Sequence, residues 1–173
     1  MKKHLLLSFL LIAAYGAYSQ ESISPAPPQE KPVYLTHATI HIGNGQVITD
    51  GTLAFSKGKI TEVGNNVPAA GADATVLDLK GQHVYPGIIA PETNLGLVEF
   101  ASVRATVDAR EVGEMNPSVR SIVAYNADSK IINTLRSNGI LLAQVTPEGG
   151  IISGASSVVQ LDAWNWEDAA YKT

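Results

Sequence analysis

Two oxygen-bearing side chains near the end of a predicted strand are the first candidates for chemistry in this chain. Glu92 and Asn94 stand two positions apart, shortly after the apolar pair Ile88-Ile89. A carboxylate and an amide oxygen can both bind a metal ion, and such a pair suits hard cations better than zinc. The alternative is that both are ordinary polar residues at a strand end.

A glycine- and serine-rich stretch, residues 146–157, is the second candidate site. It follows the continuous apolar run of residues 140–145. Glycines permit unusual backbone dihedrals, and exposed amides together with serine hydroxyls could hold an anion. No Gly-Lys-Ser/Thr ending is present, so a nucleotide-binding P-loop is not supported, and a structural loop is the alternative. The ligand-loop candidates are Gly149, Gly150, Ser153 and Gly154.

Aromatic residues and histidines supply weaker signals. In an extended segment Trp164 and Trp166 would share a face, which suits either carbohydrate stacking or packing against the protein. His37 and His41 would lie roughly 13 Å apart on one strand, too far to bind one ion directly. His83 is expected to be structural. No serine has a neighbouring histidine, so no hydrolase triad is indicated.

Composition excludes several classes of protein. The chain has 173 residues, of which 45% are hydrophobic and 16% charged, so a disordered or collagen-like chain is not expected. The net charge of −4 argues against a nucleic-acid partner. Because the chain has no cysteine, it has no disulfide, thiolate metal site or cysteine nucleophile.

The first 19 residues are typical of a signal peptide. Lys2 and Lys3 precede an apolar core over residues 5–14, and small residues at 17 and 19 fit a cleavage site. The core is too short for a comfortable membrane span, although an N-terminal anchor is the alternative. We therefore expect a secreted or periplasmic protein with no stable membrane span after cleavage. Residues 20–32 are predicted to be a proline-rich linker.

The remaining chain divides into two parts. Residues 33–85 predict a small antiparallel sheet, with Ala38 and Ile40 on one face of its first strand and His37 and His41 on the other. In residues 86–173 a helix is predicted from about Asn126 or Asp128 to residue 137, with Ile131, Ile132 and Leu135 on one stripe. The following run, 140–145, predicts a parallel strand covered on both faces. Residues 97–125 predict a loop with short helical turns.

Four short pieces in order carry a resemblance to a known family. They are Ala38-Thr39-Ile40, residues 58–64 (GKITEVG), residues 77–81 (LDLKG) and residues 84–89 (VYPGII). Together they cover residues 33–94, which resemble the N-terminus of the amidohydrolase superfamily, particularly its imidazolonepropionase-like and dihydroorotase-like members. The resemblance implies a small β-sandwich completed by distant C-terminal strands, then a (β/α)₈ metal-dependent hydrolase barrel that begins at Pro86-Gly87. It also implies hydrolysis of carbon–nitrogen bonds.

The chain departs from this family at the first metal motif. The family usually has an Asp and then His-x-His, whose two imidazoles bind one metal from the same strand face. Here Ala90 replaces the Asp, Glu92 the first His and Asn94 the second. We therefore expect the usual metal corner to be lost. A divalent metal, zinc in the family, is expected in the full-length protein and none in this chain alone.

The chain is too short for a complete barrel of this family. A full barrel needs roughly 250 residues, and only 87 follow Pro86, which is room for about two βα units. We therefore expect a mixed β and α/β chain, with a β-sandwich segment over 33–85 and an incomplete TIM-type barrel over 86–173. Two functions stay open: the N-terminal part of an exported amidohydrolase-like enzyme for a small-molecule substrate, or a non-catalytic exported binding module or inactive relative. The substrate and the oligomeric state are not indicated.

Overall fold

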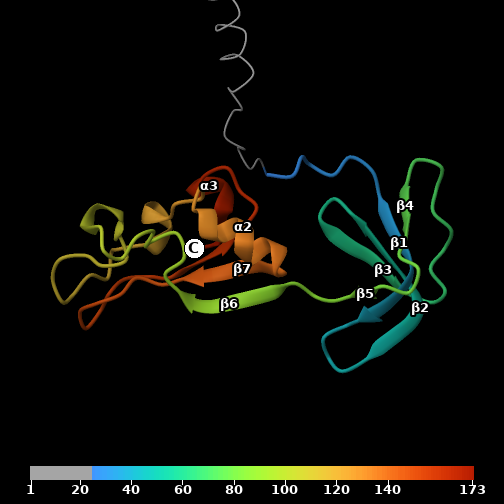
Figure 1. Ribbon diagram of the computed structural model, residues 1–173, viewed down its shortest axis with the longest axis horizontal. Coiled ribbons are helices and arrows are strands. Elements are labelled where there is room, and N and C mark those ends of the chain that lie inside the picture. The colour runs from blue at the N-terminus through green and yellow to red at the C-terminus, as the bar shows by residue number, and fades with distance from the viewer. Residues whose placement is uncertain (1–24) are drawn as a thin grey trace, which may run out of the picture.

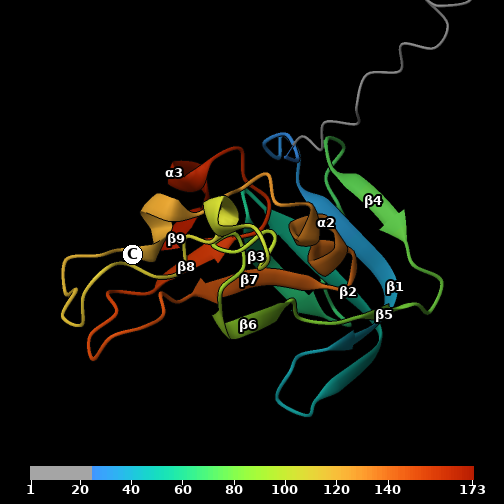
Figure 2. The same cartoon turned by 60° about the vertical axis from the view of Figure 1, so that its left-hand side comes forward.

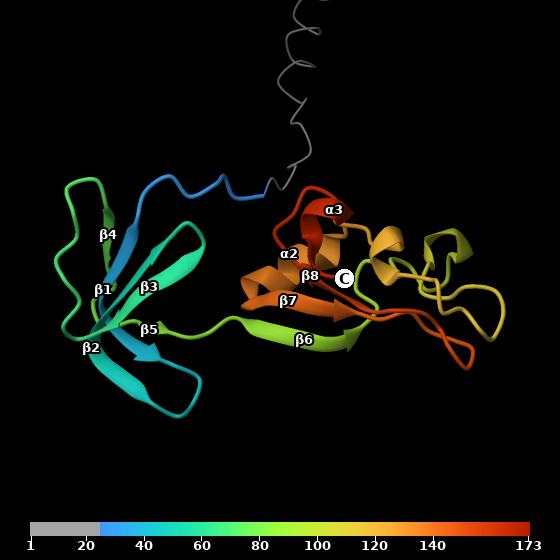
Figure 3. The same cartoon turned by 180° about the vertical axis from the view of Figure 1, so that it is seen from behind.

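The computed structural model describes residues 25–173. The predicted signal peptide lies outside the described residues. Within residues 25–173, no helix has both the length and the apolar character needed to cross a bilayer. Figures 1 and 3 show two sheets that lie apart and are joined by the segment between β5 and β6.

The first sheet is built by five strands from residues 33–84. β1 lies centrally, pairing antiparallel with β2, which pairs antiparallel with β3, while β4 and β5 both pair with β1. The strands are β1 (Val33–His41), β2 (Val47–Ser56), β3 (Lys59–Gly64), β4 (Thr75–Asp78) and β5 (His83–Val84).

Alternation along β1 determines which of its side chains are buried. Ala38 is 0% exposed and Ile40 4% exposed, and Ala54 of β2 joins them in a small core. His37, which precedes Ala38, faces solvent, and Thr39, between the two buried positions, is half-buried. The predicted face of this strand is confirmed. His37 has a φ of 52°, next to an irregularity in the β1–β2 register between Leu35 and Ala38, so a bulge precedes the alternating stretch.

The prediction of an all-antiparallel first sheet is wrong. β4 and β5 run parallel to β1, with Val33 opposite Thr75 and Thr39 opposite His83. The chain leaves β3 and crosses back through residues 65–74 before it enters β4, so it approaches β1 from the other side. Local patterns do not encode this crossing, because it depends on which edge of β1 is free.

The second sheet begins with the predicted βαβ unit. β6 (Ile88–Thr93) and β7 (Ile140–Val145) pair in parallel, and α2 (Lys130–Ser137) lies in the connection between them. This confirms the parallel pairing that the two apolar runs predict. Between β6 and α2 the chain forms loops with two short 3₁₀ turns, η1 (Arg104–Thr106) and η2 (Ser121–Ala124), as expected.

After β7 the sheet changes direction. β8 (Ser157–Gln160) returns antiparallel to β7, and β9 (Ala170–Lys172) pairs antiparallel with β8 after the short helix α3 (Trp166–Ala169). A run of βα units would instead add a further parallel strand. The described residues of this part therefore form a mixed sheet rather than a run of βα units.

One side of the second sheet carries the main core. Figures 1 and 3 show α2 and α3 on the same side of the sheet. Ile132 of α2 is buried and Leu135 packs against the core, but Ile131 is 46% exposed, so it does not belong to the predicted stripe. The buried members of this core are Leu95, Leu97, Ala109, Ile122, Tyr125, Ile132, Ala143, Val145, Val159, Leu161 and Ala169.

Apolar residues at the start of β6 and β7 are exposed. Ile88, Ile89 and Leu141 are each more than half exposed, because nothing among the described residues covers them. The prediction of strands covered on both faces is therefore wrong for residues 25–173. Exposed apolar patches of this kind mark surfaces that bury themselves against another structure.

Candidate functional site

The carboxyl ends of β6 and β7 meet and define the candidate site. Thr93, the last residue of β6, lies opposite Val145, the last residue of β7. Just beyond them the Thr146 amide donates a 2.8 Å hydrogen bond to the Thr93 carbonyl. In parallel sheets, ligand sites form where the polar segments that follow such strand ends converge. The two predicted regions, around residue 92 and after residue 145, are therefore brought to the same edge.

Glu92 occupies a bulge in β6. The register passes from Ala90 opposite Ala143 to Thr93 opposite Val145, so β6 contains one more residue than β7 over this interval. Glu92 takes up the difference in the left-handed region, with φ at 46°, which a non-glycine residue rarely adopts. Its side chain is exposed. The regular alternation that would give Glu92 and Asn94 a common face is therefore interrupted.

Asn94 is brought close to Glu148. Its Nδ2 lies 3.4 Å from Glu148 Oε1, and the Glu148 amide donates a 2.7 Å hydrogen bond to the Ala109 carbonyl. Arg110 forms an isolated parallel bridge with Glu148. The adjacent hollow has a charged lining of Arg104, Arg110, Glu111 and Glu148. Two carboxylates and two guanidinium groups thus line this hollow among apolar residues, and Asn94 contacts one of those carboxylates, Glu148.

The glycines of residues 146–157 allow two loops to approach closely. Figures 1 and 2 show the loop before η2 beside the loop before β8, and isolated bridges join them from Arg110 to Arg120. A Cβ on Gly149 would lie 2.9 Å from the Arg110 side chain, one on Gly150 2.8 Å from the Glu114 carbonyl, and one on Gly154 2.7 Å from the Val119 carbonyl.

All three of these glycines also have positive φ. The contact between the loops therefore accounts for them without a ligand. Anion binding by this stretch, including Ser153, stays a prediction.

The groups at this edge do not fit zinc. The available donors are oxygen atoms of Glu92, Asn94, Thr146 and Glu148, whereas zinc sites in proteins are dominated by imidazole and thiolate ligands. Among residues 25–173, no group of three or more His, Asp or Glu is arranged to hold a metal ion.

A partly exposed polar cluster positions the loop that follows β6. Glu99 accepts hydrogen bonds from Asn126 Nδ2 at 3.1 Å and from Ser129 Oγ at 3.0 Å, at the start of α2. A carboxylate there also interacts favourably with the helix dipole. The Tyr125 ring lies against Gly96, where a Cβ would be only 2.6 Å from it. Burial, assisted by the Glu99 charge, raises the pKa of Tyr125 to about 12.

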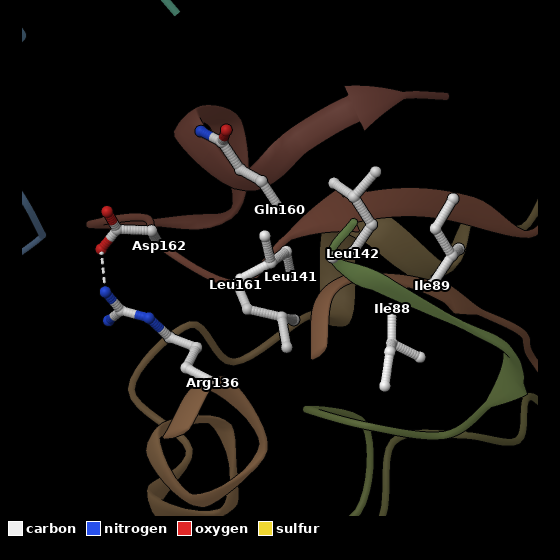
Figure 4. Close-up of a pocket in the computed structure, with 9 residues that line it drawn as sticks. Ile88, Ile89, Arg136, Leu141, Leu142, Gln160, Leu161 and Asp162 are labelled. Carbon is white, nitrogen blue, oxygen red and sulfur yellow. Dashed lines mark ion pairs between the residues drawn. The ribbon is translucent and has the colours of Figure 1, made fainter. Parts of the chain in front are cut away.

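A second hollow lies at the opposite ends of β6 and β7. Figure 4 shows its lining, which combines Ile88, Ile89, Leu141 and Leu142 with an ion pair between Arg136 and Asp162. The ion pair measures 2.7 Å, and the Asp162 carboxylate also accepts from the Ala26 amide at 3.2 Å. The pair therefore ties the predicted linker to the second sheet.

The two tryptophans do not share an extended face. Trp166 is the first residue of α3 and is 37% exposed, while Trp164 precedes the helix and is 64% exposed. Asn165 between them caps the helix by accepting a 2.8 Å hydrogen bond from the Asp168 amide. Because the helix begins at this cap, the chain is not extended from Trp164 to Trp166, and the two rings do not share a face.

Comparison with solved structures reveals the fold. No protein-family model and no curated protein matches the sequence. The chain superposes on an amidohydrolase from Thermotoga maritima with a TM-score of 0.74 and 22% identity, over 81% of this chain and 36% of that one. The chain has an amidohydrolase fold. It therefore spans about a third of the length of the Thermotoga protein.

A second match is a prolidase solved with N-methylphosphonate-L-proline. It has 19% identity and a TM-score of 0.46, over 65% of this chain and 25% of that chain.

Sequence reasoning did not single out Glu148 or Arg110. Glu148 had a usable signal, because the Thr-Pro-Glu of residues 146–148 directly follows a strand parallel to β6. Arg110 had none, since it reaches the site through a long loop. The assignment of Glu92 and Asn94 to the positions of the family's His-x-His stays a prediction.

Proposed function

We propose that this chain is the N-terminal part of an exported hydrolase of the amidohydrolase superfamily, which cleaves carbon–nitrogen bonds in non-peptide or cyclic amides. The observation that carries the proposal is the superposition on the Thermotoga amidohydrolase over 81% of this chain. Four sequence pieces over residues 33–94 independently resemble the same superfamily. The signal-like segment at residues 1–19 supports export.

The polar groups at the edge of β6 and β7 suit an amide substrate. Glu148 can accept a hydrogen bond from an amide N–H or take a proton from water, as a general base requires. Asn94 and Arg110 supply N–H donors, which suit a carbonyl oxygen that gains negative charge during hydrolysis. Asn94 already lies 3.4 Å from the Glu148 carboxylate, so this donor and this acceptor are adjacent.

The second candidate is a non-catalytic exported binding module or an inactive relative. One specific observation favours it, namely that Glu92 and Asn94 stand where the family carries two imidazoles. In this alternative the same polar groups bind an amide without hydrolysing it.

Hydrolysis by the complete gene product tests the proposal. Purified protein is assayed for amine or carboxylate release from a panel of cyclic amides and N-acyl amines. We expect turnover of at least one substrate class, and Glu148→Gln should lower kcat/KM by about 10²-fold or more. Glu62→Gln, an exposed position on β3 in the first sheet, is the matched control and should leave kcat/KM unchanged.

Two results would contradict the proposal. Binding of a panel compound without hydrolysis would establish the binding module instead. An exported protein that retains Met1, detected by mass spectrometry, would refute signal-peptide cleavage.

A further inference from the structure

Three aromatic side chains gather on one face of the first sheet. In the parallel pairing of β1 with β5, Thr39 lies opposite His83 and Ile40 opposite Val84. Because alternate residues share a face, His41 lies on the side of His83 and of Tyr85, which follows β5. The His41 and Tyr85 rings stack with centroids 4.1 Å apart and planes inclined by 11°. The chain therefore holds His41 beside His83 through backbone pairing and ring stacking.

The two imidazoles point a nitrogen at each other. His41 Nε2 and His83 Nδ1 are 2.9 Å apart, although the ring centroids are 5.1 Å apart. One N–H bridges the pair, so one nitrogen donates and the other accepts. His83 is exposed and His41 half-buried, so solutes can reach the pair. This arrangement was not expected from the sequence, because β1 and β5 lie about forty residues apart in the chain.

We propose that His41 Nε2 and His83 Nδ1 form a binding site for Cu²⁺. Metal–nitrogen bonds of about 2.0–2.1 Å place two ligands at a right angle about 2.9 Å apart, and at the tetrahedral angle about 3.3 Å apart. The observed separation of 2.9 Å is that of the N–H···N hydrogen bond, and it already brings both nitrogens within reach of a single ion. When the ion binds, the bridging proton leaves its nitrogen and the same ring takes up a proton from water at its other nitrogen, so both imidazoles stay neutral ligands. Each ring turns by roughly 45° so that its lone pair points at the ion instead of at the other nitrogen.

Ligand type favours copper over the other divalent ions. Imidazole is a good ligand for Cu²⁺, which also stands highest in affinity among the divalent first-row metals. Right-angled nitrogen ligands are typical of tetragonal Cu²⁺ sites, whereas zinc favours the wider tetrahedral angle. Water completes the coordination sphere. Tyr85 acts as a positioning residue, because its ring packs on His41 and its hydroxyl lies 3.4 Å from His83 Nδ1.

The site differs from the other surface histidine on β1. His37 Nδ1 lies 3.0 Å from Asp78 Oδ1, so its partner within residues 25–173 is a carboxylate and not a second imidazole. The Lys80 backbone N–H, and then the His37 ring, hold the pKa of Asp78 below its ordinary value. His37 therefore serves as a matched control on the same strand.

Copper titration of the complete chain tests the proposal. It is done in a His4→Ala background, because the remaining histidines of residues 1–173 are then His37, His41 and His83. Cu²⁺ is added alone and followed by calorimetry and by electron paramagnetic resonance. We expect one equivalent bound, nitrogen hyperfine structure from two imidazoles, and a higher Tm with copper, because a ligand of the native state stabilises it.

Variants separate this site from general surface binding. Loss of an outer-shell partner already costs about 10–100-fold in metal affinity, so His41→Ala and His83→Ala should each weaken copper binding by at least about 100-fold. Tyr85→Phe should retain tight binding because the stack persists, and His37→Ala should bind as the parent does. Circular dichroism of each variant checks that the fold is intact.

Equal copper affinity in the parent, His41→Ala and His83→Ala would overturn the proposal. Hyperfine structure from a single nitrogen would do the same, as would a parent that binds zinc more tightly than copper.

Discussion

The Tyr125 hydroxyl should destabilise the folded protein at neutral pH. Tyr125 is 5% exposed, and its Oη has no hydrogen-bond partner among the described residues. An unsatisfied buried polar group costs about 1–3 kcal/mol. Tyr125→Phe removes the hydroxyl and keeps the ring against Gly96. We therefore expect this variant to be more stable than the parent by about 1–3 kcal/mol at pH 7.

The same residue gives a pH signature with a defined sign. The pKa of Tyr125 rises from 10.0 to about 12 in the folded protein. Between these values the unfolded phenol loses its proton while the folded one retains it, so the unfolded state is favoured as the pH rises. Two pKa units correspond to about 2.7 kcal/mol. The parent should lose up to that amount between pH 10 and pH 12 relative to Tyr125→Phe.

Urea unfolding of the complete gene product at pH 7 and at several alkaline values measures both effects. Tyr171→Phe is the matched control, because Tyr171 is 68% exposed and its hydroxyl is accessible to water. A Tyr125→Phe variant that is less stable than the parent at pH 7 would refute the reasoning, since it would show that the hydroxyl has a partner. Equal alkaline sensitivity of parent and variant would refute the assigned pKa.

Three further changes test other parts of the structure by urea unfolding. Gly150→Ala should lower the free energy of unfolding by more than about 1 kcal/mol, because it adds a Cβ 2.8 Å from the Glu114 carbonyl at φ +67°. Gly71→Ala is the control and should cost less, because its Cβ meets nothing within 4 Å. Equal losses in the two variants would contradict the close approach of the loops. Glu99→Ala should lower the free energy of unfolding by about 1.5–3 kcal/mol, because it leaves two donors at the start of α2 without their carboxylate. An unchanged urea midpoint would contradict this. Arg136→Ala should lower the free energy of unfolding by at most about 1 kcal/mol, because its ion pair with Asp162 is partly exposed. A larger loss would contradict the weak contribution expected of a partly exposed pair.

Local patterns predicted those parts of the fold that depend on local burial. Alternation in β1 correctly placed Ala38 and Ile40 inside, because one covered face imposes a period of two. The apolar runs at residues 88–89 and 140–145 correctly predicted a parallel pair. Strand order was not predictable in the same way, since the parallel approach of β4 and β5 to β1 depends on contacts between distant segments.

The candidate site shows the same division between local and distant information. The sequence placed Glu92 and Asn94 near a strand end, and the structure has β6 end at Thr93. The bulge at Glu92 was not predicted, because it arises from the register with β7. Arg110 and the His41–His83 pair were also missed, since each joins segments that are far apart along the chain.

Zinc content tests most directly whether the β6 edge has lost the metal corner of the amidohydrolase fold. Elemental analysis is performed on the complete gene product in a His41→Ala background, so that the imidazole pair does not contribute. With oxygen donors at Glu92 and Asn94, we predict fewer than two equivalents of zinc, and the same content in Glu92→Ala and Asn94→Ala. Two tightly bound equivalents, of which Glu92→Ala removes one, would contradict the account.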